Sequence, residues 1–325
     1  MSSGVTTRSE STVELDAVIT RRRIEAEGVV SLTLTAASGE PMPPWEPGAH
    51  IDVLLPGGVE RQYSLCGDPN DRSQWRIAIL REDQGRGGSR WLHDNAEEGG
   101  RLRVRGPRNN FPLVEADRYL FIGGGIGITP LLTMIRRAQH RGAHWNLVYG
   151  GRRESSMAFL DELRPFGDRV RILPEDVHGL LDVPGLLAEA AEGTVVYCCG
   201  PTGLLDVVQK HCADRFPGAL HIERFTPAEP VGPREGDRPV EVVCEYSEKT
   251  VVVPPGQSIL EALLEEGVEV ESSCSEGTCG TCEVAVRSGI PDHRDSVLTE
   301  DERAAGETMM ICVSRARSDR LVLDI

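Results

Sequence analysis

A chain of 325 residues is long enough for two or three domains, and its 39% hydrophobic and 26% charged residues are typical of a globular protein. A formal net charge of -16 argues against nucleic acid or an anionic membrane as a partner. The chain has no apolar run of about eighteen residues that would span a membrane. Its first residues lack the apolar segment of a secretion signal, which predicts a cytoplasmic protein with reduced cysteines.

Residues 13–116 predict a small antiparallel β-barrel. The residues before them, 1–12, are polar and aperiodic and predict a disordered tail. Apolar and polar residues then alternate in short strands that are separated by glycine and proline clusters, as in many small barrels. The expected strands are 13–19, 29–34, 51–55 and 75–80.

Residues 117–226 predict an α/β domain, because short apolar strands alternate with helical patterns. The expected strands are 119–122, 146–149, 170–173 and 194–197, and the expected helices are 130–139, 156–163 and 180–191. A proline-rich stretch, 227–239, predicts a semi-rigid linker. Residues 240–325 then predict a third domain, with a hairpin and a helix at 258–266 ahead of a cysteine-rich loop.

Two stretches of the barrel predict an anion site. In Arg61-Gln-Tyr63-Ser64-Leu65, the arginine and the tyrosine share one strand face, where they could bind a phosphate and a flat ring. An ordinary exposed strand is the alternative, and the flanking Asp52 and Glu60 need no role beyond solvation. In Gly87-Gly88-Ser89, a glycine turn runs into a helix whose N–H groups could bind an anion, with a plain helix N-terminus as the alternative.

A second glycine turn, Gly123-Gly-Gly125-Ile-Gly127-Ile-Thr129-Pro130, follows a strand and precedes a helix. Thr129 is expected to be the N-cap and Pro130 the first helical residue, so that a pyrophosphate could approach the helix dipole. The spacing departs from the ordinary G-x-G-x-x-G fingerprint, and a structural turn is the alternative. Cys199-Gly200-Pro201 ends a neighbouring strand, where the thiol could face a nicotinamide or simply fill the core.

The strongest motif is Cys274-Ser-Glu-Gly-Thr-Cys279-Gly-Thr-Cys282, followed at a distance by Cys312. The spacing C-x4-C-x2-C with a later cysteine is the plant-type 2Fe-2S pattern. The intervening glycines let the backbone wrap around a cluster. A zinc site or a disulfide is the alternative, but zinc sites usually pair two C-x2-C units.

The charge is uneven along the chain. Residues 240–325 carry 18 acidic against 7 basic side chains. Such an acidic segment is a candidate docking surface for a basic protein, and a solvated surface is the alternative.

Taken in order, these motifs resemble those of the ferredoxin reductase-like family, and in particular its phthalate dioxygenase reductase branch, which includes vanillate demethylase reductases. The resemblance covers residues 13–325. It implies a flavin barrel, a nucleotide domain and a β-grasp ferredoxin domain. This domain order implies FMN rather than FAD. The Arg152-Arg153 pair leaves NADPH as an alternative to NADH.

The resemblance also implies site residues. Arg61 would bind the flavin phosphate, and Ser64 would lie near N5 of the ring. The residues expected at the flavin and the nucleotide are Arg61, Tyr63, Ser64, Leu65, Gly87, Gly88, Ser89, Gly124, Gly125, Gly127, Thr129, Pro130, Cys199, Gly200 and Pro201. Ser64, Cys199 and Phe225 are expected at the reacting rings, and Cys274, Cys279, Cys282 and Cys312 at the 2Fe-2S cluster.

The implied activity is an NADH-dependent reductase. A hydride passes to the flavin, which delivers single electrons to the cluster and then to a terminal oxygenase component. A Rieske-type component of an aromatic-ring dioxygenase or O-demethylase is the expected partner. A cytochrome P450 is the alternative acceptor, and a non-enzymatic redox sensor is a third hypothesis.

Overall fold

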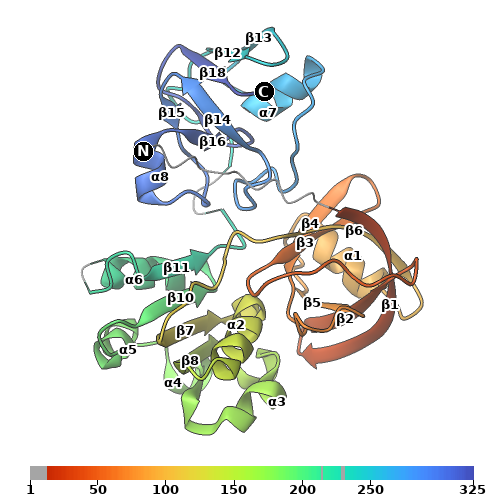
Figure 1. Ribbon diagram of the computed structural model, residues 1–325, viewed down its shortest axis with the longest axis vertical. Helices are drawn as coiled ribbons and strands as arrows, with labels where there is room; N and C mark the ends of the chain where they lie inside the picture. The colour runs from red at the N-terminus through yellow and green to blue at the C-terminus, as the bar shows by residue number, and fades with distance from the viewer. Residues whose placement is uncertain (1–12, 214, 228–230) are drawn as a thin grey trace. The chain divides into compact units, whose positions relative to one another are not determined.

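The computed structural model describes residues 13–213, 215–227 and 231–325, so the predicted tail and residues 228–230 of the predicted linker lie outside the described residues. The chain divides into two compact units, Met1–Cys199 with Val207–Ile222, and Gly200–Asp206 with Glu223–Ile325. The first unit holds an antiparallel barrel and a parallel sheet (Figure 1). Among the described residues, no helix is long and apolar enough to cross a membrane.

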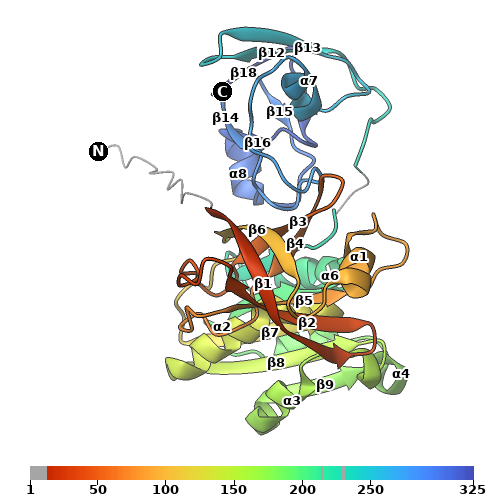
Figure 2. The same ribbon diagram turned by 90° about the vertical axis from the view of Figure 1, so that its right-hand side faces the viewer.

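The barrel is a six-stranded antiparallel sheet in the order β4-β3-β6-β1-β2-β5. The end strands β4 and β5 also contact each other, which closes the sheet. Figure 2 shows the long strand β1 beside β2 and β6, its partners in the sheet. All four predicted strands are confirmed. The elements are β1 Val13–Ala26, β2 Val29–Ala36, β3 His50–Leu55, β4 Val59–Ser64, β5 Trp75–Leu80, α1 Gly88–Asn95 and β6 Arg101–Arg108.

The second sheet of this unit has the order β11-β10-β7-β8-β9, and β10, β7, β8 and β9 run parallel to their neighbours. β7 is buried from its second residue to its last, as expected of a strand covered on both faces. The elements are β7 Arg118–Gly124, η1 Gly125–Gly127, α2 Ile128–His140, β8 His144–Gly151, η2 Glu154–Ser156, α3 Leu160–Leu163, η3 Arg164–Arg169, β9 Val170–Pro174, α4 Glu175–His178, α5 Val183–Glu189, β10 Val195–Cys199, α6 Thr202–Cys212 and β11 Leu220–Glu223.

Two expected helices are shorter than predicted. The helix expected at 156–163 is reduced to α3, because Phe159 takes a left-handed backbone conformation that interrupts the helical path. The helix expected at 180–191 is reduced to α5, which Asp182 caps by accepting the backbone N–H of Gly185 at 3.1 Å.

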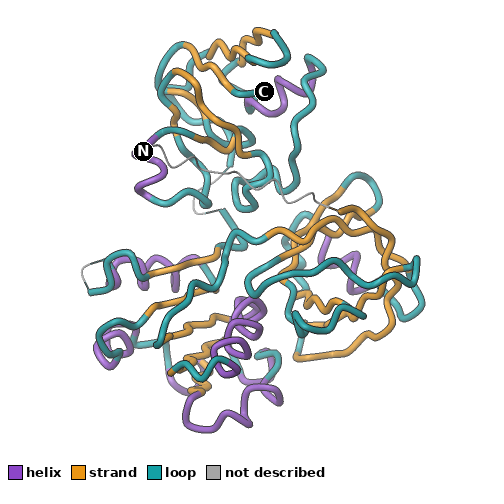
Figure 3. The backbone as a smooth tube through the Cα atoms, viewed as in Figure 1, coloured by secondary structure: helices purple, strands orange, loops and turns teal. Residues whose placement is uncertain are grey.

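The second unit is an α+β domain with the strand order β13-β12-β18-β14-β16. β12 and β13 form the predicted hairpin, and β12 also pairs in parallel with the C-terminal β18. Figure 3 shows the long irregular loop between α7 and β14, which carries three of the predicted cluster cysteines. The elements are β12 Val240–Cys244, β13 Lys249–Val253, α7 Ile259–Glu265, β14 Glu283–Ser288, β15 Pro291–Asp292, α8 Glu300–Ala305, β16 Thr308–Met310, β17 Arg315–Ala316 and β18 Arg320–Leu323. The predicted fold class, a barrel with an α/β domain and a ferredoxin-like domain, is confirmed.

Candidate cofactor-binding sites

The predicted flavin motif lies on β4, at one end of the barrel's strand order. Arg61 and Tyr63 are partly buried and alternate on this strand, so their side chains share one face. Ser64 is buried at the end of the strand, and Leu65 is fully buried in the barrel core. Burial raises the pKa of Tyr63 above its usual value, so the phenol keeps its proton. A guanidinium and a neutral aromatic ring therefore stand on the same face.

The structure brings the predicted glycine turn against Arg61. Gly87, with a φ of +85°, precedes α1, and Gly88 is its first residue. A Cβ atom on Gly88 would lie 2.5 Å from Cγ of Arg61 and 2.8 Å from its Nε, so glycine leaves room for this side chain. Arg61 donates through Nη2 to the carbonyl oxygen of Arg86 at 3.1 Å. Ser89, the next residue, accepts a hydrogen bond from a backbone N–H of the preceding loop. A guanidinium beside a helix N-terminus fits the flavin phosphate.

A buried ion-pair network beside the flavin motif was not predicted. Asp52 on β3 is fully buried and accepts hydrogen bonds from Nε of Arg105 at 3.0 Å and Nη2 of Arg108 at 2.6 Å, both on β6. It also accepts a hydrogen bond from Gln62 of the motif at 3.0 Å. Glu60 pairs with Arg105 at 2.5 Å. The interpretation that both acids need no role beyond solvation was therefore wrong, because Asp52 is fully buried and requires cationic partners, and Glu60 pairs with one of the same arginines.

The sequence does show arginines at alternate positions along β6, which places them on one strand face. This pattern did not predict the network, because the strand order that brings β6 beside β3 cannot be inferred from it. The network ties β4 to β3 and β6 and so supports the strand that carries the flavin motif.

The predicted nucleotide turn joins β7 to α2 through the 3-10 turn η1. Gly127 is the N-cap residue of α2, and no side chain caps the helix. Thr129 is therefore not the N-cap, and its hydroxyl donates instead to the carbonyl oxygen of Ile126 at 3.0 Å. Pro130 is the third residue of α2 rather than the first, because the helix begins at Ile128. The prediction was wrong because the 3-10 turn runs directly into the helix and replaces the side-chain cap.

The two nucleotide motifs leave the parallel sheet at the same edge. β10 lies beside β7 with Cys199 opposite Gly123, so the turn that starts at Gly124 begins next to Cys199. Cys199 is fully buried. A Cβ atom on Gly125 would meet no described atom within 4 Å, so the turn is open on that side. An open glycine turn at the carboxyl ends of parallel strands and the N-terminus of a helix fits a dinucleotide pyrophosphate.

Two further predicted groups have different surroundings. Arg152 and Arg153 directly follow β8 and are exposed, so the choice between NADH and NADPH stays as the sequence leaves it. Phe225 follows β11, is 40% exposed and belongs to the second unit. Its place beside the flavin stays a prediction.

The four predicted cluster ligands come together in the second unit. Cys274, Cys279 and Cys282 lie on the loop between α7 and β14, Cys312 follows β16, and all four are buried. The side chain of Cys274 contacts those of Cys279 and Cys312, and Cys312 also contacts Cys282. The thiols thus converge from two distant segments of the chain.

The donor set of this group fits a cationic centre. Sγ of Cys274 accepts the backbone N–H groups of Glu276 at 3.3 Å and Thr278 at 3.5 Å. Contacts with the neighbouring thiols lower the pKa of Cys274 and raise the pKa of Cys312 above their usual values. Four thiolates can share this space only when positive charge compensates them, as the irons of a 2Fe-2S cluster do.

The zinc and disulfide alternatives fit less well. A zinc site places three or four ligands on one ion, whereas a 2Fe-2S cluster spreads four thiolates over two irons. All nine cysteines are free thiols in the structure.

The cluster loop is held by a close approach of the backbone. Gly277 has a φ of +68°, and a Cβ atom there would lie 2.5 Å from Cγ2 of Val313 and 3.0 Å from Cα of Asp295. Asp295 is buried and accepts the backbone N–H groups of Val297 at 3.0 Å and Leu298 at 2.9 Å. The sequence did not predict this role of Asp295 in ordering the turn against Gly277.

Comparisons with known proteins agree with these sites. The family model of the oxidoreductase NAD-binding domain matches residues 121–173, and that of the 2Fe-2S iron-sulfur cluster binding domain matches residues 242–317. The chain is 43% identical over 302 residues to the phenoxybenzoate dioxygenase subunit beta of Ectopseudomonas oleovorans. The matched region covers 92% of this chain and 94% of that protein.

Two solved structures extend the likeness to the fold. The structure of phthalate dioxygenase reductase matches with a TM-score of 0.70 and 38% identity, over 96% of this chain and 98% of that one. An intact type IV self-sufficient cytochrome P450 monooxygenase matches with a TM-score of 0.89 and 43% identity. That match covers 96% of this chain but only 41% of the P450 chain.

The matched domains make the chain an oxidoreductase that binds a pyridine nucleotide and a 2Fe-2S cluster. The flavin barrel, the nucleotide sheet and the C-terminal cluster domain match phthalate dioxygenase reductase over nearly the full length of both chains. The chain belongs to the phthalate dioxygenase reductase branch of the ferredoxin-NAD(P) reductase-like family.

Proposed function

We propose that this protein is the reductase component of an oxygenase system and carries electrons from NADH through FMN and a 2Fe-2S cluster to a Rieske-type terminal oxygenase. The proposal rests on one observation, the presence in a single chain of the Arg61–Gly88 phosphate site, the glycine turn before α2 and the four-cysteine loop. The similar dioxygenase subunit and phthalate dioxygenase reductase support an aromatic substrate for the system. A cytoplasmic location belongs to the proposal, because Cys66, Cys198, Cys199, Cys212 and Cys244, which are not cluster ligands, suit a reducing compartment as free thiols.

The residues of the first unit bind and orient the two rings. Arg61 and the N-terminus of α1 hold the flavin phosphate, Tyr63 lies against the flavin ring, and Ser64 lies near its N5 atom. The N-terminus of α2 holds the pyrophosphate of NADH, and Cys199 lies at the nicotinamide. When bound, the flavin supplies the conversion of a two-electron hydride into single electrons, which an iron-sulfur cluster requires.

The residues of the second unit hold the cluster and meet the acceptor. The four cysteines bind the irons, and their burial keeps water away from them. Glu271 is exposed on the cluster loop, Glu283 is exposed at the start of β14, and Glu276 is partly exposed. These carboxylates are the proposed contact with a basic acceptor surface. Raising the ionic strength should therefore slow reduction of the acceptor, and an unchanged rate would contradict the docking contact.

The electron path is tested by separating its two exits. The purified holoprotein should reduce cytochrome c with NADH as donor, and it should also reduce a small dye that accepts electrons from the flavin. Cys279→Ser should abolish cytochrome c reduction and leave dye reduction intact, because only the cluster loses a ligand. Cys244→Ala, which changes a buried cysteine of the same unit that is not a ligand, should keep both activities. Equal loss of both activities in Cys279→Ser would refute the order of cofactors.

A cytochrome P450 is the second candidate acceptor, and the match to the self-sufficient P450 monooxygenase favours it. The protein should be reconstituted with a Rieske oxygenase and with a P450, and NADH-dependent substrate turnover should be compared. Turnover with the P450 alone would replace the Rieske acceptor in the proposal. Negligible NADH oxidation by protein loaded with FMN and iron would instead support a redox sensor.

A further inference from the structure

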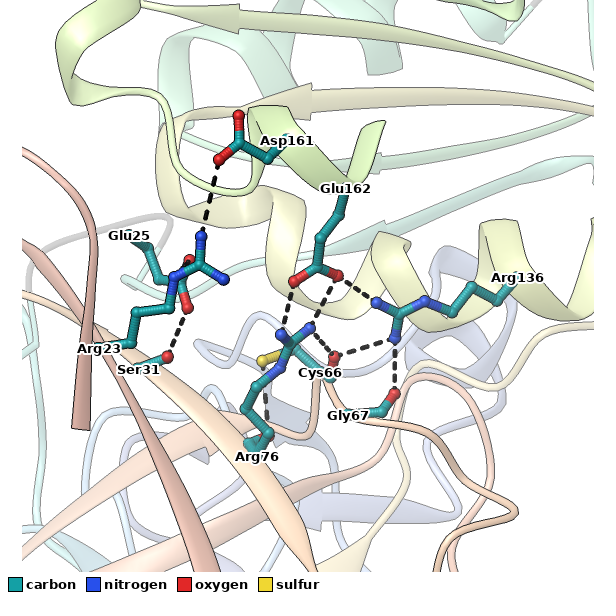
Figure 4. Close-up of polar contacts among 9 residues, drawn as sticks. All are labelled: Arg23, Glu25, Ser31, Cys66, Gly67, Arg76, Arg136, Asp161 and Glu162. Atoms are coloured by element: carbon teal, nitrogen blue, oxygen red, sulfur yellow. Dashed lines mark hydrogen bonds and ion pairs between the residues drawn. The ribbon is translucent and has the colours of Figure 1, made fainter. Parts of the chain in front are cut away.

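A partly buried ion pair joins the barrel to the α/β part of the first unit. Glu162 on α3 accepts hydrogen bonds from Nη1 of Arg76 at 2.6 Å and from Nη2 of Arg76 at 3.1 Å, and Arg76 lies on β5 of the barrel. Glu162 also accepts a hydrogen bond from Arg136 on α2. Figure 4 shows this carboxylate between the two guanidinium groups. One side chain thus connects a barrel strand with two helices of the nucleotide sheet.

Both arginines also hold the end of the flavin motif. Arg76 donates through Nη2 to the carbonyl oxygen of Cys66 at 2.8 Å, and Arg136 donates through Nη1 to the carbonyl oxygens of Cys66 at 3.3 Å and Gly67 at 2.9 Å. Cys66 and Gly67 directly follow Arg61-Gln-Tyr-Ser-Leu65. Arg136 lies on α2, whose N-terminus is the nucleotide turn. The network therefore connects the flavin-binding segment to the helix that begins at the nucleotide turn.

Backbone strain is retained beside this pair. Phe159 is a non-glycine residue with a φ of +63°, is 2% exposed, and directly precedes α3. Its ring lies under the guanidinium of Arg76, 5.0 Å from the ring centroid. A conformation of this kind costs about 1–3 kcal/mol and persists where surrounding contacts hold it. The strained residue both orients the ring toward Arg76 and starts the helix that carries Glu162.

The neighbouring pair on the same helix is weaker. Asp161 lies 3.6 Å from Arg23, and its side chain is 82% exposed, whereas that of Glu162 is 25% exposed. Although burial raises the pKa of a carboxyl group, the hydrogen bonds and charges of Arg76 and Arg136 hold the pKa of Glu162 below its usual value. Glu162 is therefore charged at neutral pH, and its contacts are stronger than those of an exposed pair.

We infer that Glu162 is a positioning residue, which holds the flavin-binding segment and the nucleotide turn in the relative orientation needed for hydride transfer. This inference rests on the proposed function, since it concerns the transfer from NADH to the flavin. A misplacement of about 1 Å can slow a bound reaction by roughly 100-fold, so a contact outside the reacting rings can control the rate. Glu162 touches neither ring in this role.

Other contacts keep the two parts together when the charge of Glu162 is removed. The backbone N–H of Glu27 donates to the carbonyl oxygen of Ser155 at 2.8 Å, and Arg137 pairs with Glu46 at 2.9 Å. Each of these contacts joins the barrel to the nucleotide sheet. Glu162→Gln is therefore expected to loosen the orientation of the two parts and to leave both folded.

The test compares Glu162→Gln with Asp161→Asn, which removes the adjacent exposed carboxylate. In rapid mixing of the flavin-loaded protein with saturating NADH, Glu162→Gln should slow flavin reduction about tenfold or more, with a smaller change in the apparent affinity for NADH. The deuterium isotope effect with 4-deuterated NADH should rise, because hydride transfer then limits the rate more fully. Asp161→Asn should match the wild type in rate and isotope effect.

A second readout does not depend on activity. Hydrogen exchange of the full chain without NADH should be faster in Glu162→Gln for the segments 64–68 and 157–163 and unchanged in Asp161→Asn. Arg136→Gln should repeat both effects, which guards against a folding defect specific to one variant. Flavin reduction and exchange at wild-type levels in Glu162→Gln would overturn the inference, as would equal slowing in Asp161→Asn. Failure of the wild type to oxidise NADH would refute the proposed function, whereas the exchange comparison would still test the contact.

Discussion

Replacement of Gly88 by alanine provides a sharp test of the flavin phosphate site. The new Cβ atom would lie 2.5 Å from Cγ of Arg61, whereas ordinary contacts between carbon atoms are about 3.5–4.0 Å. Arg61 must therefore move by about 1 Å or more, and its guanidinium leaves the N-terminus of α1. The backbone of Gly88 is outside the left-handed region, so alanine fits the helix itself and is a better helix former than glycine.

The size of the effect follows from the lost contact. A hydrogen bond to a charged group contributes roughly 1.5–3 kcal/mol. Its loss should raise the dissociation constant for FMN roughly 10- to 150-fold. Titration of apoprotein with FMN, followed by quenching of flavin fluorescence, measures this constant. Riboflavin, which lacks the phosphate, should bind the variant and the wild type equally, because Arg61 is assigned to the phosphate alone.

Gly85→Ala is the matched control in the same loop. A Cβ atom there would meet its nearest neighbours at 3.5 Å, an ordinary contact, so FMN affinity should be unchanged. Thermal unfolding of each apoprotein checks that the variants fold. A folded Gly88→Ala variant that binds FMN within twofold of the wild type would refute the phosphate site, and an equal loss of riboflavin binding would place the defect elsewhere.

Three further predictions concern the cluster loop and the buried ion pairs. Gly277→Ala should reduce the iron content and the visible absorbance of the 2Fe-2S cluster. Gly277 has a φ of +68°, and a Cβ atom there would lie 2.5 Å from Cγ2 of Val313, so no side chain fits. Gly256→Ala, where a Cβ atom would meet no described atom within 4 Å, should have no effect. Normal iron content in Gly277→Ala would contradict the tight loop. Hydrogen bonds from Arg294 lower the pKa of Asp237 from 3.8 to about 2, so this pair stabilises the fold above pH 3.8 and the contribution is lost as the pH falls toward 2. Asp237→Asn should therefore lower the free energy of unfolding by about 1 kcal/mol at pH 7 and by less below pH 3. Urea unfolding at the two pH values measures this difference, and an equal loss at both would contradict the charge argument. Asp52→Ala should cost about 3–5 kcal/mol in the same assay, because two arginines lose a fully buried partner, and a loss below 1 kcal/mol would show that the network does not stabilise the barrel.

Much of the fold and of the candidate site could be predicted from the chain itself. The alternation of apolar residues located all four expected barrel strands, and apolar runs located β7 to β10 within one or two residues, because strand periodicity is a local property. The cysteine spacing indicated the 2Fe-2S site, since three ligands come from one short loop. The motifs between these segments carried the family resemblance, which the comparisons confirm.

Predictions from local sequence patterns were wrong where contacts between distant residues determine the backbone conformation or the ion-pair partner of a side chain. The helix expected at 156–163 is interrupted because Phe159 packs under Arg76, a residue far away in the sequence. Thr129 was expected as an N-cap, but a 3-10 turn precedes α2 and replaces that cap. Asp52 was interpreted as solvated, because the β3–β6 pairing that buries it is not a local property.

The sequence by itself therefore determined the family, the order of the cofactor domains and the residue types at each site. The tertiary structure decided which of these residues meet: Gly88 against Arg61, Cys312 against Cys274, and Glu162 between Arg76 and Arg136. The physical reason is that residue type and local periodicity are written in neighbouring positions, whereas the contacts that place a phosphate site, a cluster or a nicotinamide arise only when distant strands and helices pack together.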